Sequence, residues 1–173
     1  RSKMKYNFHG ARKIALGGVF GALPVICVLL ASVLPTNKLS LYTLSSFFIA
    51  VIIIESGVMA GFSFFAATGL LSIIIVPEKT AVIPYLIFFG LYGIVKFYIE
   101  KLKKVVFEYI LKFLYFNISI AVVWFTVSSL FELVLPEGMP WWILVVAAEI
   151  VFFIYDIVYT LFIKYYRENC VPG

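Results

Sequence analysis

Four acidic residues lie within stretches that are otherwise apolar, and they have the greatest capacity for chemistry. They are Glu55, Glu132, Glu149 and Asp156. A charged side chain within a membrane is costly, so it usually faces the interior of a helical bundle or a water-filled cavity. Glu55 and Glu132 stand near the ends of their stretches, where capping a turn or contact with water accounts for them. Glu149 and Asp156 stand deeper, and their spacing places them on one face of a helix.

These two deeper acids allow both a structural and a functional interpretation. Asp156 can pair with a lysine such as Lys96 or Lys112 near the inner end of the helices, which would lock two helices together. For Glu149 no cation lies at a matching depth, so a place in a ligand cavity and a structural place both stay open. An intramembrane acid without a cation is neutral, solvated by a cavity or bound to a ligand.

The preceding apolar stretch carries a stripe of polar and aromatic residues that could face Glu149. Its members recur at helical spacings of three and four, and they are Asn117, Ala121, Trp124, Ser128 and Glu132. Aromatic walls with a few convergent polar groups are typical of small-molecule sites. We therefore predict an outward-opening pocket between these two helices, covered by the turn at 35–38. The predicted ligand-binding residues are Asn37, Trp124, Ser128 and Glu149.

The motifs of catalytic and metal sites are missing from the sequence. The single histidine, His9, precedes the first apolar stretch, and the chain contains no HExxH, CxxC or GxSxG motif. It contains no Walker A motif either, so an ATP-driven role would need a separate ATPase. We predict a protein that is not an enzyme and that holds no metal or cofactor.

The composition is that of an integral membrane protein. The sequence is 64% hydrophobic and 13% charged, whereas about 25% of residues are charged in a typical soluble chain. A helix needs about 20 apolar residues to cross a bilayer, and comparable stretches recur between short turns rich in proline, lysine and glycine. They predict an all-α fold: a bundle of six transmembrane helices forming a single domain over residues 1–173. The predicted spans are 14–34, 39–54, 58–76, 82–99, 105–135 and 141 to about 164.

The cations set the predicted orientation of this bundle. With the N-terminus inside, the inner segments hold all but two of the 14 lysines and arginines, and the outer turns hold only Lys38 and Lys79. Such an excess in short loops marks the cytoplasmic side. We therefore predict that both termini are cytoplasmic, with residues 1–13 as a basic N-terminus and residues 165–173 as a tail.

A stripe of small residues runs along the first predicted helix. Ala11, Ala15, Gly18 and Ala22 share one face. Small faces let helix backbones approach closely, which is a main source of helix association in lipid. The stripe either packs this helix within its own bundle or docks a separate membrane protein, and both interpretations stay open.

The third and fourth predicted helices carry features that concern packing. Gly57, Gly61, Thr68 and Ser72 share one face of the third helix, which we therefore expect to be central and closely packed. In the fourth helix, Pro84 removes a backbone hydrogen bond, so we expect a kink there.

Three further features bear on the family. The first span opens with Arg-Lys-Ile-Ala at 12–15 followed by small residues, the turn at 37–39 reads Asn-Lys-Leu, and the third helix starts rich in glycine. With its length and its six predicted spans, the chain resembles the substrate-binding S-components of energy-coupling factor (ECF) vitamin transporters. This resemblance implies a vitamin site reached from the outer side through the first outer loop and the later helices. It also implies that the small-residue face of the first helix docks onto a transmembrane coupling subunit, which works with cytoplasmic ATPases.

The expected function is therefore a membrane-embedded substrate-capture subunit of an ECF-type importer for a vitamin or similar small molecule, in the cell membrane of a prokaryote. One alternative is a small multi-span scaffold resembling the MreD-type cell-shape proteins, with no transported ligand. Another is a self-contained carrier that uses Glu149 and Asp156 as a proton path. A capture subunit requires an outer cavity, whereas a scaffold does not. Nucleic acid is not an expected partner, because the cations gather at helix ends.

Overall fold

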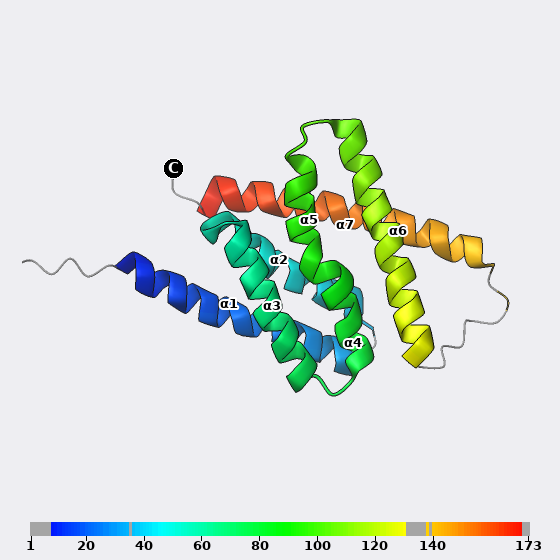
Figure 1. The fold of residues 1–173 in the computed structure, drawn as a ribbon, viewed down its shortest axis with the longest axis horizontal. Coiled ribbons are helices and arrows are strands. Elements are labelled where there is room, and N and C mark those ends of the chain that lie inside the picture. The colour runs from blue at the N-terminus through cyan, green and yellow to red at the C-terminus, as the bar shows by residue number, and fades with distance from the viewer. Residues whose placement is uncertain (1–7, 35, 131–137, 139, 171–173) are drawn as a thin grey trace, which may run out of the picture.

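The computed structural model describes residues 8–34, 36–130, 138 and 140–170. Within these residues the regular structure is entirely helical, as the apolar stretches predict (Figure 1). In chain order the elements are α1 (Phe8–Val33), α2 (Lys38–Ser56), α3 (Val58–Ile75), α4 (Lys79–Pro84), the π-helical turn η1 (Tyr85–Phe89), α5 (Gly90–Glu100), α6 (Val105–Leu130) and α7 (Trp141–Cys170). Glu132, which the sequence singles out, lies outside the described residues.

Five helical segments of the described chain are long and apolar enough to cross a membrane. They are Lys38–Ser56, Val58–Ile75, Lys79–Glu100, Val105–Ser129 and Trp141–Cys170. The remaining helix, α1, has 26 residues, of which Gly17–Val33 form a shorter apolar stretch. Both end helices are longer than their predicted spans, since α1 begins at Phe8 and α7 continues to Cys170. The predicted cytoplasmic end segments are therefore helical in part.

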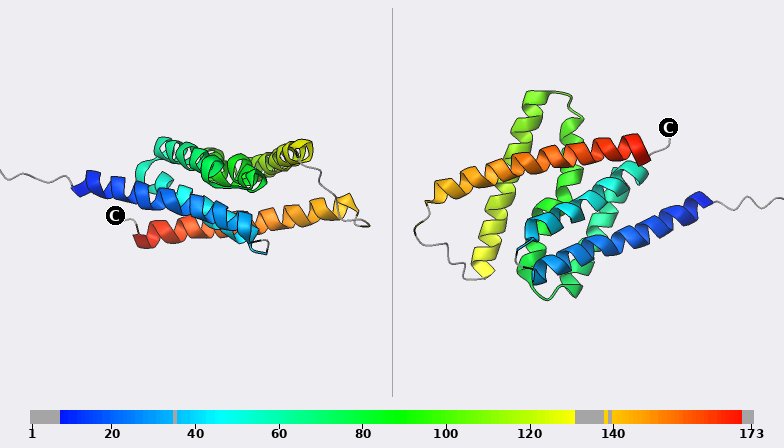
Figure 2. Two further views of the ribbon diagram at one scale, coloured as in Figure 1. Left: turned by 90° about the horizontal axis from the view of Figure 1, so that it is seen from below. Right: turned by 180° about the vertical axis from the view of Figure 1, so that it is seen from behind.

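The helices form two layers (Figure 2). One layer holds α3, the continuous segment from α4 to α5, and α6, while the other holds α1, α2 and α7. Helix α7 runs obliquely across the others. Helix α1 begins and α7 ends on the same side of the molecule, where α2 also meets α3 (Figure 1).

The segment from α4 to α5 is the centre of the fold. In its most apolar part 56% of the residues are buried, against 22% for α3 and 17% for α6 and α7. The prediction that the third helix is central is therefore wrong, although its face of Gly61, Thr68 and Ser72 is buried. Small residues set how closely one face of a helix is packed, but not how many sides of that helix have neighbours.

The side chain of Tyr159 on α7 reaches the backbone of α5 at a position where α5 has a glycine. A Cβ added to Gly93 would overlap the hydroxyl group of Tyr159. The Tyr159 side chain is completely buried, and its hydroxyl donates a hydrogen bond of 3.3 Å to the carbonyl of Ser46 on α2. This crossing therefore fixes α2, α5 and α7 relative to one another.

The predicted kink at Pro84 takes the form of a π-helical turn. Helix α4 ends at Pro84, and the five residues of η1 follow before α5 begins at Gly90. Proline has no backbone N–H to donate to the preceding turn, so the helix accommodates a wider turn here. The turn buries Phe88 and Phe89, which become part of the pocket described below.

Candidate functional site

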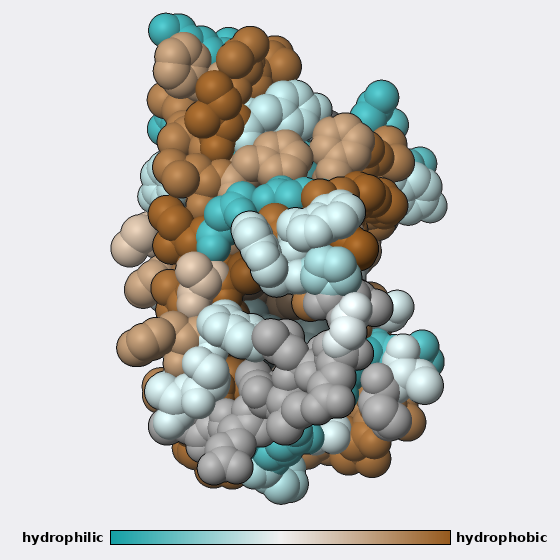
Figure 3. Space-filling view, turned by 90° about the vertical axis from the view of Figure 1, so that its right-hand side faces the viewer, coloured by the Kyte–Doolittle hydropathy of each residue, from teal (hydrophilic) through white to brown (hydrophobic). Residues whose placement is uncertain are grey.

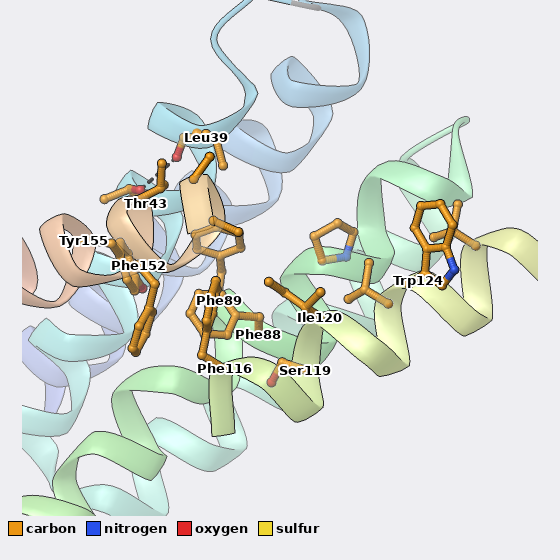
Figure 4. A pocket seen from close by; sticks show the side chains of 16 residues that line it. Leu39, Thr43, Phe88, Phe89, Phe116, Ser119, Ile120, Trp124, Phe152 and Tyr155 are labelled. Carbon is orange, nitrogen blue, oxygen red and sulfur yellow. Dashed lines mark hydrogen bonds between the residues drawn. The ribbon is translucent and has the colours of Figure 1, made fainter. Parts of the chain in front are cut away.

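A pocket of about 520 Å³ lies between the two layers, at one end of the bundle. Its walls come from the first halves of α2, of the α4–α5 segment and of α7, and from the middle and second half of α6 (Figure 4). The lining residues are Leu39, Thr43, Pro84, Phe88, Phe89, Phe116, Ser119, Ile120, Val123, Trp124, Val127, Ala147, Ala148, Val151, Phe152 and Tyr155. Figure 3 shows the side of the molecule near the second half of α6 and the start of α7, which is hollowed near its centre.

Aromatic rings form the inner wall of this pocket. Phe116 of α6 and Phe152 of α7 are stacked, with ring centroids 4.3 Å apart and an angle of 11° between the planes. Phe88 meets both of them edge-on, at 5.6 and 5.9 Å. Offset and edge-to-face pairs of this kind are favourable, so the wall is set by contacts within the protein.

The hydroxyl groups in the pocket wall are already engaged by the protein. Thr43 donates to the carbonyl of Leu39 at 2.8 Å, and Ser119 donates to the carbonyl of Tyr115 at 2.7 Å. The hydroxyl of Tyr155 donates to the side chain of Ser46 at 2.9 Å. Among the described lining residues, only Trp124 has a side-chain N–H, and this group makes no hydrogen bond to the described part of the chain. The pocket is therefore almost entirely apolar in character.

Of the four predicted ligand-binding residues, Trp124 lies in the pocket wall. Ser128 is exposed one turn further along α6, and its hydroxyl donates to the carbonyl of Phe125. Asn37 is exposed just before α2, and the residue of that region which reaches the pocket is Leu39. Glu149 is adjacent in sequence to the lining residue Ala148 but does not line the pocket itself.

Glu149 instead joins α7 to α6 beside the pocket. The side-chain amide of Asn117 donates a hydrogen bond of 2.7 Å to one carboxyl oxygen of Glu149. The other carboxyl oxygen is buried and has no hydrogen-bond partner in the described part of the chain. The sequence placed Asn117 on the stripe facing Glu149, but helical spacing alone did not reveal that these two side chains meet.

A cluster of four charges, three of them buried and one, Glu100, partly exposed, lies towards the opposite end of the bundle. Lys96 contacts Asp156 at 2.6 Å and Glu100 at 2.7 Å. Lys112 contacts Glu100 at 2.8 Å and Asp156 at 3.3 Å. The predicted pairing of Asp156 with a lysine is confirmed, and both candidate lysines take part.

Two hydroxyl groups complete the cluster. Tyr92 donates a hydrogen bond of 2.5 Å to Asp156, and Lys96 donates one of 2.8 Å to Thr160. Lys96 and Asp156 are buried, with 1% and 4% of their surface exposed. Because two cations face two anions, the cluster is neutral as a unit, and it connects α5, α6 and α7. The place of Glu100 in this cluster was not predicted from the sequence, although the i,i+4 spacing of Glu100 from Lys96 is a signal that could have indicated it.

Glu55 makes a separate contact at the same end of the molecule. Its carboxylate accepts a hydrogen bond of 2.9 Å from the hydroxyl of Tyr166 on α7. The turn between α2 and α3 is closed by the backbone, through a bond from the N–H of Gly57 to the carbonyl of Ile53. Glu55 therefore links two helices instead of capping the turn.

The small-residue face of α1 points away from the rest of the described molecule. Ala15, Gly18 and Ala22 are exposed, and no described atom lies within 4 Å of a Cβ added to Gly18. The side chain of Ala11, the fourth predicted member, lies outside the described residues. Ala22 also borders a groove of about 220 Å³ between α1 and α3. Packing within the described chain does not account for this face.

Comparison with protein-family models, with curated proteins and with solved structures finds no match for this chain. Within the described residues no group of three or more His, Cys, Asp or Glu side chains is arranged to hold a metal ion. The features that bear on function are therefore the pocket, the charge cluster and the exposed face of α1.

Proposed function

We propose that this chain is the substrate-capture subunit of an ECF-type importer in a prokaryotic cell membrane. It binds a small molecule in the pocket between α6 and α7, and it docks through α1 onto a transmembrane coupling subunit served by cytoplasmic ATPases. The observation that carries this proposal is the pocket itself. Its volume of about 520 Å³ falls within the range of about 300–1,000 Å³ typical of small-molecule sites.

The position of the pocket supports capture from the outside. The excess of cations at the termini and at the loop between α5 and α6 favours an orientation with both termini cytoplasmic. In this orientation all four walls of the pocket belong to the outer halves of their helices, and the charge cluster lies in the inner half. The charge cluster of Lys96, Glu100, Lys112 and Asp156 occupies the inner half. The pocket therefore belongs to the outer half of the bundle.

The exposed face of α1 supports a partner. In lipid, association between helices depends on close packing and not on hydrophobic burial. A helix that displays Ala15, Gly18 and Ala22 outwards offers a backbone surface that another helix can approach closely. A scaffold protein would also have partners, so the pocket remains the feature that separates the two functions.

Native mass spectrometry of the protein purified in mild detergent tests capture. We expect a fraction of the protein to carry a small molecule, and replacing the wall residue Trp124 with alanine should reduce that fraction because it removes stacking area. If neither the purified protein nor protein incubated with cell extract carries a small molecule, the scaffold function replaces the capture function.

Affinity purification from native membranes tests the partner. Gly18→Leu should abolish co-purification of a coupling subunit and ATPases, since a large side chain holds the two helices apart. Ala121→Leu is the matched control because it adds a leucine to an exposed position of α6 outside the pocket. Loss of the partners in both variants, or in neither, would contradict docking through α1.

A further inference from the structure

We infer that the ligand of this pocket is an uncharged, hydrocarbon-rich molecule, and that it enters from the lipid bilayer between α6 and α7. The inference rests on the proposed capture function for the claim that the pocket binds a ligand. It goes beyond that function in naming the chemical class of the ligand and its route of entry.

The hydrogen-bonding groups of the wall exclude a polar ligand. A polar molecule that leaves water loses its hydration, and the site must replace those hydrogen bonds for binding to be favourable. Here the hydroxyl hydrogens of Thr43, Ser119 and Tyr155 are directed to protein acceptors. The indole N–H of Trp124 is the single unused donor of the described wall. Besides this N–H, a water-soluble vitamin would find only the three hydroxyl oxygens as acceptors, which are too few to replace the bound water of several polar groups.

The charges near the pocket are turned away from it. No residue that lines the pocket is charged. Asp156 follows the lining residue Tyr155, but both of its oxygens are held by Lys96, Lys112 and Tyr92. Glu149 is directed to Asn117 and is not part of the lining. A ligand carboxylate or ammonium group would therefore be buried without a partner of opposite charge, which is strongly unfavourable.

The mouth of the pocket lies between α6 and α7 and is apolar. On α6 the lining residues Ile120 and Trp124 are 42% and 46% exposed, and on α7 the lining residue Val151 is 47% exposed. Leu39 at the start of α2, which is 58% exposed, borders the same opening, so apolar side chains of α2, α6 and α7 surround it. Deeper in the pocket, Phe116 and Phe152 are almost completely buried.

The depth of this mouth matches the hydrocarbon layer. Val151 follows Trp141 at the start of α7, and at 1.5 Å per residue it lies about 15 Å further along the oblique helix axis, so it is at most about 15 Å deeper. The hydrocarbon core of a bilayer is about 30 Å thick. If Trp141 stands at the outer interface, as tryptophans tend to do, the mouth opens into lipid acyl chains and not into water. Only a molecule that dissolves in the bilayer can take this route.

Photolabelling of the full-length protein in lipid nanodiscs tests this inference. The first probe is an iodinated phenyl(trifluoromethyl)diazirine, which is small, aromatic and uncharged. We expect labelling of the pocket residues of α6 and α7 that saturates with probe concentration, above the non-saturable labelling of lipid-facing side chains. Ala147→Phe should lower the saturable labelling by about tenfold, because Ala147 is an exposed wall residue whose enlargement obstructs the mouth without altering the core.

Two controls accompany this variant. Val122→Phe places a phenyl ring at an exposed position of α6 outside both the pocket and the stripe that faces α7, and the saturable labelling should be unchanged. Circular dichroism and size-exclusion chromatography establish that both variants are folded. If Ala147→Phe does not fold, displacement of the diazirine from the wild type by unlabelled naphthalene supplies the same information. Failure of naphthalene to displace the diazirine would contradict the inference.

A second probe distinguishes the two sources of an apolar occupant. It is a phosphatidylcholine with a diazirine in one acyl chain. Strong, saturable labelling of the pocket by this lipid would support an apolar ligand and its entry from the bilayer. It would also mean that the pocket binds a membrane lipid and not a substrate for import. Labelling by the free aromatic probe and not by the lipid would support both the apolar class of the ligand and the capture function.

A third measurement can overturn the chemical class while capture stands. Isothermal titration with water-soluble riboflavin and thiamine should show no binding. If either vitamin binds and Ala147→Phe abolishes that binding, the pocket recognises a polar ligand, and the inference is wrong.

Discussion

Replacing Lys96 with methionine removes the most deeply buried cation from the charge cluster at the end of the bundle opposite the pocket. In the structure Asp156 then retains Lys112, at 3.3 Å, and the hydroxyl of Tyr92. Glu100 retains Lys112 at 2.8 Å. The buried Asp156 and the partly exposed Glu100 then share one cation, so the cluster carries a net negative charge beside position 96, where the exposure is 1%. Removing one partner of a buried ion pair costs about 3–5 kcal/mol, and we expect Lys96→Met to destabilise the fold by this amount.

A double variant separates charge imbalance from lost packing. Lys96→Met combined with Asp156→Leu leaves Lys112 paired with Glu100, so the remaining pair is neutral. Since an apolar replacement for a complete buried ion pair is often neutral or stabilising, the double variant should be more stable than Lys96→Met alone. The recovery should be about 2 kcal/mol or more. Lys101→Met is the control for losing an exposed lysine at the same end of α5, with an expected effect below about 0.5 kcal/mol.

Unfolding in mixed detergent micelles, followed by far-ultraviolet circular dichroism, measures these differences. The reasoning would be refuted if Lys96→Met were as stable as Lys101→Met, since the cluster would then be solvated and not buried. It would equally be refuted if adding Asp156→Leu lowered stability further, because the two side chains would then contribute independently.

Further predictions concern the helix crossing, the orientation and Glu149. Gly93→Ala should destabilise the fold by about 1–3 kcal/mol, because the added methyl group overlaps the Tyr159 hydroxyl. Gly18→Ala is the control and should not destabilise the fold, since no described atom lies near this position. Equal melting temperatures for the two variants would argue against the contact of Tyr159 with Gly93. In intact cells, an impermeant thiol reagent should leave Cys170 unlabelled, because the C-terminus is proposed to be cytoplasmic. The reagent should label Cys170 after the cells are opened, since Cys170 is exposed and the other cysteine, Cys27, is buried. Labelling of Cys170 from outside would mean that the orientation is reversed. Glu149→Gln should leave the free energy of unfolding within about 1 kcal/mol of the wild type, because glutamine can still accept the hydrogen bond from Asn117. A large decrease in the melting temperature would mean that Glu149 acts as a charged group.

The helices and one part of the charge cluster could be predicted from the sequence. Apolar length depends only on local composition, so the ends of α2 and α3 fall within about two residues of the predicted spans. The pairing of Asp156 with lysine was also accessible, because a buried acid needs a cation and few lysines lie at its depth. The participation of both lysines, and of Glu100 between them, depends on three helices meeting, which spacing along one helix does not reveal.

The centre of the bundle and the walls of the pocket could not be predicted in the same way. All the spans are apolar, so hydropathy does not distinguish a helix surrounded by protein from one surrounded by lipid. The small residues of α3 therefore suggested that α3 is the centre of the bundle. In the structure the centre is instead the α4–α5 segment, which runs through Pro84 and η1. The stripe through Trp124 correctly indicated one wall, but the π-helical turn that brings Phe88 and Phe89 to the pocket has no clear sequence signal beyond the proline.

A cryo-electron microscopy map of the protein in lipid nanodiscs, with a bound antibody fragment to aid alignment, tests the central claim most directly. The account predicts density that belongs to no side chain in the space beside the stacked rings of Phe116 and Phe152, with α6 and α7 held apart at the mouth. A map in which side chains of α6 and α7 fill this space, with no room for a ligand, would contradict it.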